Sequence, residues 1–107
     1  MSVVKINILG DIYPTPDTRR YFDSNDSKGL FGDVLSDIKT ANFSLCNVEF
    51  PLIDSGKPAI KTGPILSGKV AYSELFKDAG FNLVSLGNNH IKDYGEKGVL
   101  STLKAFE

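Results

Sequence analysis

The fold of this chain is decided by the segment at residues 81–90, which reads FNLVSLGNNH. Its first six residues are mainly apolar, and the glycine and two asparagines that follow are typical of a tight turn. This pattern predicts a β-strand over residues 81–86 that ends in a polar turn. Immediately upstream, residues 69–79 carry apolar side chains at helical spacing, and Gly80 is a usual residue at a helix C-terminus. Downstream, the same spacing predicts a final helix that includes residues 99–106.

Two further strands are predicted upstream, with a helix between each strand and the next. The run VVKINIL predicts a strand over residues 3–9, and FSLCNV predicts another over residues 43–48. Apolar side chains at helical spacing predict a helix over residues 31–41, after a loop at residues 11–29 that holds one short helical turn. Strands that alternate with helices are typical of an α/β fold built from β-α-β units with a mainly parallel sheet.

Composition and charge exclude several classes of function. The chain has 107 residues, of which 41% are hydrophobic and 23% charged, as expected for one globular domain over residues 1–107. Its net charge of -1 provides no overall attraction for nucleic acid, so no nucleic-acid partner is expected. The sequence shows no signal peptide and no apolar stretch of membrane-spanning length. The single cysteine, Cys46, can form neither an internal disulfide nor a zinc ribbon, so cysteine usage does not indicate the redox compartment of the protein.

Side chains with metal-binding chemistry follow each predicted strand. Asp11 follows the first strand and Glu49 the second. Asn89 and His90, the only histidine, follow the third. Because the carboxyl ends of parallel strands lie along one edge of a sheet, we expect these side chains to meet there. Carboxylate, carboxamide and imidazole groups suit Mn²⁺, Fe²⁺ or Mg²⁺. The sequence therefore predicts a divalent metal site with the ligands Asp11, Glu49, Asn89 and His90. These four ligands are too few to hold a pair of ions.

Each of these residues also has a structural interpretation, which the sequence leaves open. Gly10 and Asp11 form a common turn pair, and the asparagines before His90 tolerate a left-handed turn. Glu49 can simply satisfy a neighbouring backbone donor. The metal site is therefore one of two interpretations of the same residues.

Other polar residues favour structural roles. Asp93 is interpreted as the N-cap of the last helix rather than as a ligand. The lysines within and beside the loop at residues 54–68, including Lys61, favour a solvated loop over a site for an anionic substrate. The sequence contains no P-loop, no dinucleotide-binding glycine motif and no serine-nucleophile elbow.

The most specific pattern lies in three segments: ILGD at residues 8–11, NFSLCNVEFPL at residues 42–52 and AGFNLVSLGNNHIKDYG at residues 79–95. They resemble the CapA family of bacterial capsule and poly-gamma-glutamate synthesis proteins, which is related in fold to calcineurin-like metallophosphoesterases. The resemblance implies that residues 1–107 are a single truncated CapA-like domain, the N-terminal half of an α/β/β/α sandwich. The chain departs from the phosphoesterase pattern at Tyr13, where an Asp-x-His motif would place histidine.

The resemblance also implies roles for individual residues. Asp11 is expected to be a metal ligand after the first strand, and Glu49 a bridging carboxylate. Asn89 and His90 are expected to supply a ligand and a catalytic contact to the transition state. The metal site is expected to be incomplete in this fragment, since further histidine ligands would lie beyond Glu107.

By the same resemblance, the parent protein is expected to act in capsule or poly-gamma-glutamate biosynthesis as a metal-dependent, phosphoesterase-like hydrolase or transferase, with the fragment alone inactive. The alternative is a non-catalytic component that binds or exports the polymer. Expected partners are an anionic polymer or a phosphate-containing small substrate, and the remainder of a parent chain associated with the cell envelope. Because half a sandwich leaves an apolar sheet face uncovered, the chain is also expected to dimerise through that face.

Overall fold

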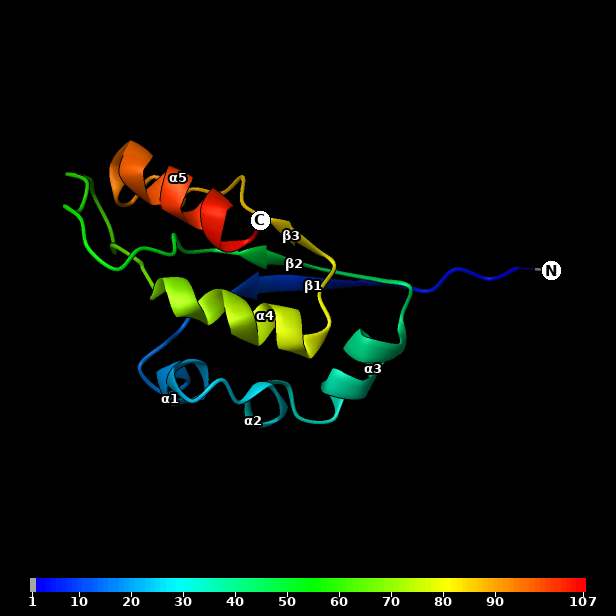
Figure 1. The fold of residues 1–107 in the computed structure, drawn as a ribbon. Coiled ribbons are helices and arrows are strands. Elements are labelled where there is room, and N and C mark those ends of the chain that lie inside the picture. The colour runs from blue at the N-terminus through cyan, green and yellow to red at the C-terminus, as the bar shows by residue number, and fades with distance from the viewer. Residues whose placement is uncertain (1) are drawn as a thin grey trace.

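The computed structural model describes residues 2–107 and shows a parallel sheet of three strands with helices packed against one of its faces (Figure 1). The strands are β1 (Ile6–Ile12), β2 (Phe43–Val48) and β3 (Leu83–Ser85), and they lie side by side in this order. Both neighbouring pairs are parallel, and the connections between the strands carry helices. The predicted α/β fold with a parallel sheet is confirmed.

Strand β1 begins and ends later than the sequence predicts, because its position is set by β2. Ile6 pairs with Phe43, the first residue of β2, and the Lys5 carbonyl accepts from the Phe43 N–H at 3.2 Å where the ladder begins. A shift of register between Ile8 and Asp11 then allows β1 to continue past its predicted end. The predicted strand over residues 3–9 was therefore wrong at both ends, and Asp11 lies within the strand instead of in a turn after it.

The segment between β1 and β2 forms three short helices where the sequence predicts a loop and one helix. Helices α1 (Arg19–Asp23) and α2 (Ser27–Phe31) occupy the predicted loop, and α3 (Val34–Thr40) follows them. Gly32 separates α2 from α3 with a positive φ of 57°, which glycine adopts without the strain that a side chain would bring. The helix predicted over residues 31–41 is therefore limited to α3, and the predicted loop holds two short helices where one helical turn was expected.

The helices predicted in the second half of the chain are confirmed. A 3-10 turn, η1 (Val70–Tyr72), leads into α4 (Ser73–Ala79), and Gly80 ends α4 in the left-handed conformation with a φ of 104°. Strand β3 is shorter than predicted, and α5 (Gly95–Ala105) follows the polar turn. None of the helices within residues 2–107 has the length and apolar character needed to span a bilayer.

The core lies between the covered face of the sheet and the helices, and aromatic rings form its centre. The ring of Phe22 in α1 lies 5.3 Å from that of Tyr72 and 6.1 Å from those of Phe50 and Phe76, measured between centroids. All of these rings are buried, and a fully buried ring of this kind contributes about 1.5–3 kcal/mol. The cluster joins α1, α4 and the segment after β2, and it thereby sets the path of the chain as it leaves β2.

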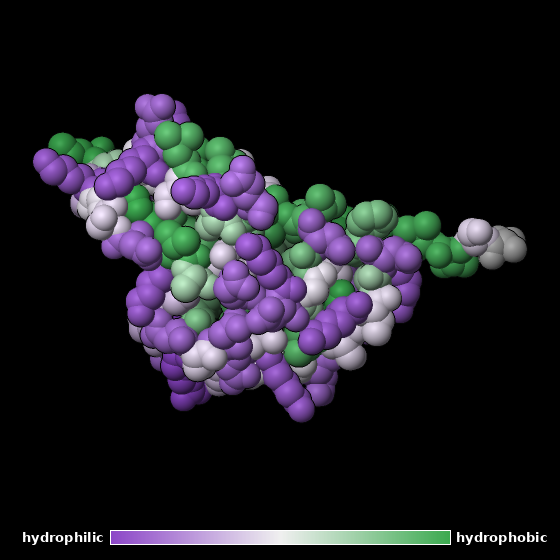
Figure 2. Space-filling model, viewed as in Figure 1, coloured by the Kyte–Doolittle hydropathy of each residue, from purple (hydrophilic) through white to green (hydrophobic). Residues whose placement is uncertain are grey.

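The other face of the sheet is uncovered. Every second side chain along each strand points to this face. Between β1 and β2, Ile6 lies beside Phe43 and Ile8 lies beside Leu45. Between β2 and β3, Leu45 lies beside Leu83. All but Leu45 are exposed, and Ile8 is exposed to 75%. We call these five residues the open sheet face. Figure 2 shows apolar surface along the N-terminal segment that leads into β1.

Gly68 provides a test of the aromatic core. A Cβ atom at Gly68 would lie 2.5 Å from a ring carbon of Phe50 and 2.7 Å from one of Tyr72. Because both rings are buried, we expect Gly68→Ala to lower the free energy of unfolding by about 1–3 kcal/mol, measured by urea denaturation. Gly10→Ala is the control, since its Cβ would meet no atom within 4 Å. Equal stability of the two variants would contradict this packing.

Candidate functional site

The ends of the strands bring polar side chains together at one edge of the sheet. Asp11 pairs in register with Asn47, and Asn47 pairs with Ser85, just before the turn that follows β3. The side-chain amide of Asn47 donates to Asp11 Oδ1 at 2.7 Å. Glu49 directly follows β2, and its backbone N–H donates to the Ile12 carbonyl at 3.0 Å. The structure therefore places the polar residues of β1 and β2 side by side.

Glu49 lies between Asp11 and His90. Its Oε1 atom is 3.9 Å from His90 Nε2. Burial is the main cause that raises the pKa of Glu49, and contact with the Asp11 carboxyl raises it further, against the opposing effect of His90. Two carboxylates in contact repel each other when both are ionised. The arrangement therefore favours a proton or a cation between Asp11 and Glu49.

Asn88 attaches the turn after β3 to β2. Its side-chain amide donates to Asn47 Oδ1 at 3.1 Å and to the Val48 carbonyl at 2.8 Å. Its side-chain oxygen accepts from the backbone N–H of His90 at 3.0 Å. Asn89, the asparagine that the sequence predicts as a ligand and catalytic residue, is exposed. The structure thus joins Asn88 to the cluster by hydrogen bonds, and no feature of the sequence separates the two adjacent asparagines.

Asp93 has a role that the sequence analysis missed. It is fully buried, and its carboxylate lies 2.6 Å from His90 Nδ1 while it accepts from the Leu66 N–H at 2.7 Å and from Lys61 Nζ at 2.6 Å. Burial alone would raise the pKa of Asp93, but these three donors outweigh it and hold the pKa below its ordinary value. The predicted N-cap role was wrong, because Tyr94 is the N-cap of α5 and makes no side-chain cap. The spacing of three residues from His90 was the available signal.

Lys61 connects the loop at residues 54–68 to this cluster. Most of the loop is exposed, as the sequence predicts, but the Lys61 side chain is only 27% exposed because it pairs with Asp93. Its ammonium group also donates to the Asn89 carbonyl at 3.3 Å. The backbone N–H of Ala59 donates to the Asp93 carbonyl at 2.7 Å. The loop is therefore attached to the turn after β3 through side-chain and backbone bonds.

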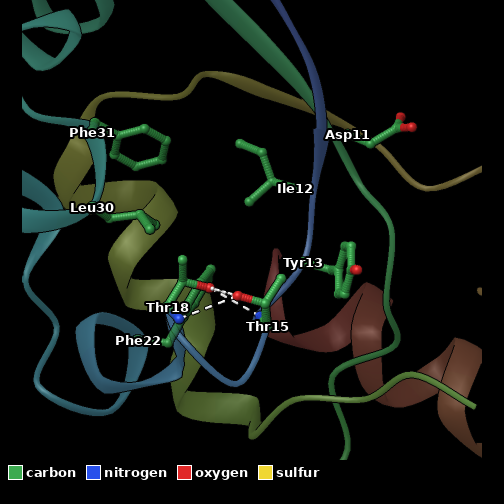
Figure 3. Close-up of a pocket in the computed structure, with 8 residues that line it drawn as sticks. All are labelled: Asp11, Ile12, Tyr13, Thr15, Thr18, Phe22, Leu30 and Phe31. Carbon is green, nitrogen blue, oxygen red and sulfur yellow. Dashed lines mark hydrogen bonds between the residues drawn. The ribbon is translucent and has the colours of Figure 1, made fainter.

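A cavity of about 250 Å³ lies near the end of β1, mainly on the side of the strand opposite the Asp11 carboxylate. Asp11 borders it, but most of its lining is apolar and includes Ile12, Leu30 and Phe31. Figure 3 shows Ile12 directed toward Leu30 and Phe31, whereas the Asp11 carboxylate lies on the opposite side of β1. The cavity is therefore a hollow under the helices and does not receive the carboxylates.

The donors at the sheet edge are of the kind that hard or borderline divalent ions prefer. Asp11 and Glu49 supply carboxylate oxygens, and His90 supplies Nε2. Cys46 is no candidate ligand, because it is buried and its burial raises the pKa of the thiol to about 12. Within residues 2–107, no group of three His, Cys, Asp or Glu side chains is arranged to hold an ion. An ion at this edge would thus need further donors, such as water or amide oxygens.

The adjacent asparagines offer a matched pair of variants. We expect Asn88→Ala to lower the free energy of unfolding by about 1–3 kcal/mol, because it removes three hydrogen bonds and leaves the buried Val48 carbonyl without a partner. Asn89→Ala is expected to change it by less than about 0.5 kcal/mol, because Asn89 is exposed. Urea denaturation measures both values, and a larger loss for Asn89→Ala would contradict the assignment.

Two comparisons with known proteins place the chain in a family. Residues 5–107 match the family described as "Bacterial capsule synthesis protein PGA_cap". The chain is 29% identical over 105 residues to "Capsule biosynthesis protein CapA" of Bacillus anthracis, in an alignment that covers 95% of this chain and 26% of that protein. The chain thus spans about a quarter of the length of this curated relative. The resemblance seen in the sequence is confirmed, and the chain belongs to the bacterial capsule synthesis protein family PGA_cap.

Proposed function

We propose that this chain forms part of a divalent metal site in a protein of capsule or poly-gamma-glutamate biosynthesis, and that the complete site acts as a phosphoesterase-like hydrolase or transferase. The proposal rests on the position of Glu49, which lies close to both Asp11 and His90 at the edge of the sheet. The capsule context rests on the family and on the relative named CapA. The proposed substrate is an anionic polymer or a phosphate-containing small molecule.

Asp11, Glu49 and His90 are the proposed metal ligands, in a site that these three side chains do not form by themselves within residues 2–107. The crowding of the two carboxyl groups supports this assignment, since a cation between them removes the repulsion that contributes to the raised pKa of Glu49. When bound, such an ion polarises a phosphoryl oxygen and lowers the pKa of a bound water. Asn89 carries an exposed side chain on the same turn, and we assign to it a further ligand position and, with His90, contact with the reacting group.

The remaining ligands are proposed to come from water, from the substrate and from the rest of the parent protein. The chain corresponds to 26% of its CapA relative, so three quarters of a protein of that length lie outside it. Mn²⁺ and Mg²⁺ prefer about six donors, and the three side chains supply only part of such a shell. Association of the parent with the cell envelope belongs to the same proposal, because the relative is named for capsule biosynthesis.

Binding of Mn²⁺ alone tests the proposed ligands. We expect the chain to bind Mn²⁺, seen as loss of the electron paramagnetic resonance signal of the free ion. Asp11→Asn and His90→Ala should each weaken binding by more than about tenfold, since even a missing outer-shell partner has that effect. Asp54→Asn is the control, because the Asp54 carboxylate accepts from the Val70 N–H at 3.0 Å, outside the cluster. Unchanged free Mn²⁺ together with binding of poly-gamma-glutamate would favour the non-catalytic alternative and overturn the proposal.

We also propose that a second copy of this chain covers the open sheet face when the chain is alone in solution. The face aligns apolar side chains of all three strands, and Ile8 and Ile6 on the edge strand β1 are more than half exposed. Soluble monomers rarely expose apolar patches of this kind, and an edge strand offers unpaired backbone groups to another chain.

Light scattering tests this interface. We expect the wild-type chain to be a dimer and Ile8→Lys to be a folded monomer, because the charge is placed on the interface while the substituted side chain has few contacts within the chain. Val34→Lys is the control, since Val34 is an exposed apolar residue on α3, away from the open sheet face. A compact wild-type monomer would contradict the proposal.

A further inference from the structure

The Asp93 carboxylate joins segments that lie far apart in the sequence. His90 belongs to the turn before α5, whereas Lys61 and Leu66 belong to the loop between β2 and η1. The Asp93 side chain is only 1% exposed, and an isolated carboxylate in such a position would be strongly disfavoured. Here each of its oxygens has a donor from the loop, so the carboxylate is held in one position beside the imidazole.

The contact with Asp93 determines which nitrogen of His90 carries the proton. The Leu66 N–H and the Lys61 ammonium group can only donate, so the Asp93 oxygens that they contact act as acceptors. Oδ2, which already accepts from Leu66, also lies 2.6 Å from His90 Nδ1. A contact this short between two acceptors would be repulsive, and the proton of the pair therefore belongs to Nδ1.

The Lys61 ammonium group supplies a positive charge beside the buried Asp93 carboxylate, from the loop and not from the ring. Lys61 Nζ lies 2.6 Å from Asp93 Oδ1, on the oxygen that His90 does not contact. The other charged group that faces the ring is Glu49, whose Oε1 is 3.9 Å from Nε2. With a proton on Nδ1 of a neutral ring, Nε2 presents its lone pair on the side of Glu49.

We propose that Asp93 is a positioning residue that holds His90 in the Nδ1–H form with the Nε2 lone pair directed toward Glu49, and that Lys61 keeps the Asp93 carboxylate in place. Metal-binding histidines are commonly oriented in this way by a carboxylate on the nitrogen that does not bind the metal. That Asp93 strengthens metal binding by His90 rests on the proposed function. The position of the proton on the imidazole ring is independent of the proposed function and can be tested without any metal.

Nitrogen NMR of the imidazole tests the positioning role directly. His90 is the only histidine of the chain, so long-range ¹H–¹⁵N correlations of ¹⁵N-labelled protein report on this ring alone. At about pH 8.5, above the ordinary imidazole pKa, we expect the Nδ1–H form in the wild type. In Asp93→Asn the fraction of the Nε2–H form should rise, and in the control Asp54→Asn it should not. An Nε2–H ring in the wild type would overturn the proposal, whether or not the Asp93 variant folds.

The Mn²⁺ measurement separates this inference from the proposed function. If the wild type binds Mn²⁺, Asp93→Asn should weaken binding by about 10–100-fold, with a circular dichroism spectrum that shows the variant to be folded. Unchanged Mn²⁺ affinity in the folded variant would overturn the positioning role. If the wild type binds no Mn²⁺, the proposed ligand site fails, and the NMR result alone decides the role of Asp93.

Discussion

Parallel pairing of β1, β2 and β3 places Asp11 beside Asn47 and Asn47 beside Ser85, and the whole polar edge depends on this register. Between the pairs Ile8–Leu45 and Asp11–Asn47, β1 uses one residue more than β2. Without that extra residue, Gly10 would stand opposite Asn47 and no carboxylate would reach this position. A local irregularity in one strand therefore decides which side chain β1 contributes to the edge.

A buried charge links this edge to the rest of the molecule. Asp93 is fully enclosed, and its partners come from the turn that carries His90 and from the loop that carries Lys61 and Leu66. Buried ion pairs of this kind contribute little net stability, because desolvation offsets most of the attraction. Their effect is to select one arrangement of the groups. In this chain the selected arrangement turns one nitrogen of the imidazole toward Asp93 and the other toward Glu49.

The two faces of the sheet differ in whether their apolar side chains are buried. One face is covered by helices around the aromatic core, where Phe22 and Phe76 exclude water. The open sheet face carries exposed apolar residues of all three strands, among them Ile8 and Leu83. A domain that buries only one face of its sheet has not used all of its apolar surface. The open sheet face is the surface on which a second copy of the chain is proposed to pack.

The sequence by itself determined the order of helices and strands in the second half of the chain, the parallel sheet and the family, because the apolar spacing and the turn residues around Gly80 and Gly87 are local signals. It also indicated that Glu49 and His90 follow neighbouring strands, whereas Asp11, predicted after the first strand, lies within β1. Only the tertiary structure decided the extent of β1 and the role of Asp93. These depend on partners distant in the sequence: β2 sets the extent of β1, and Lys61 and Leu66, about 30 residues upstream, turn a predicted helix cap into a buried carboxylate. Spacing along the chain describes neighbours within one element, whereas the strand register and the burial of a charge exist only once separate elements have packed together.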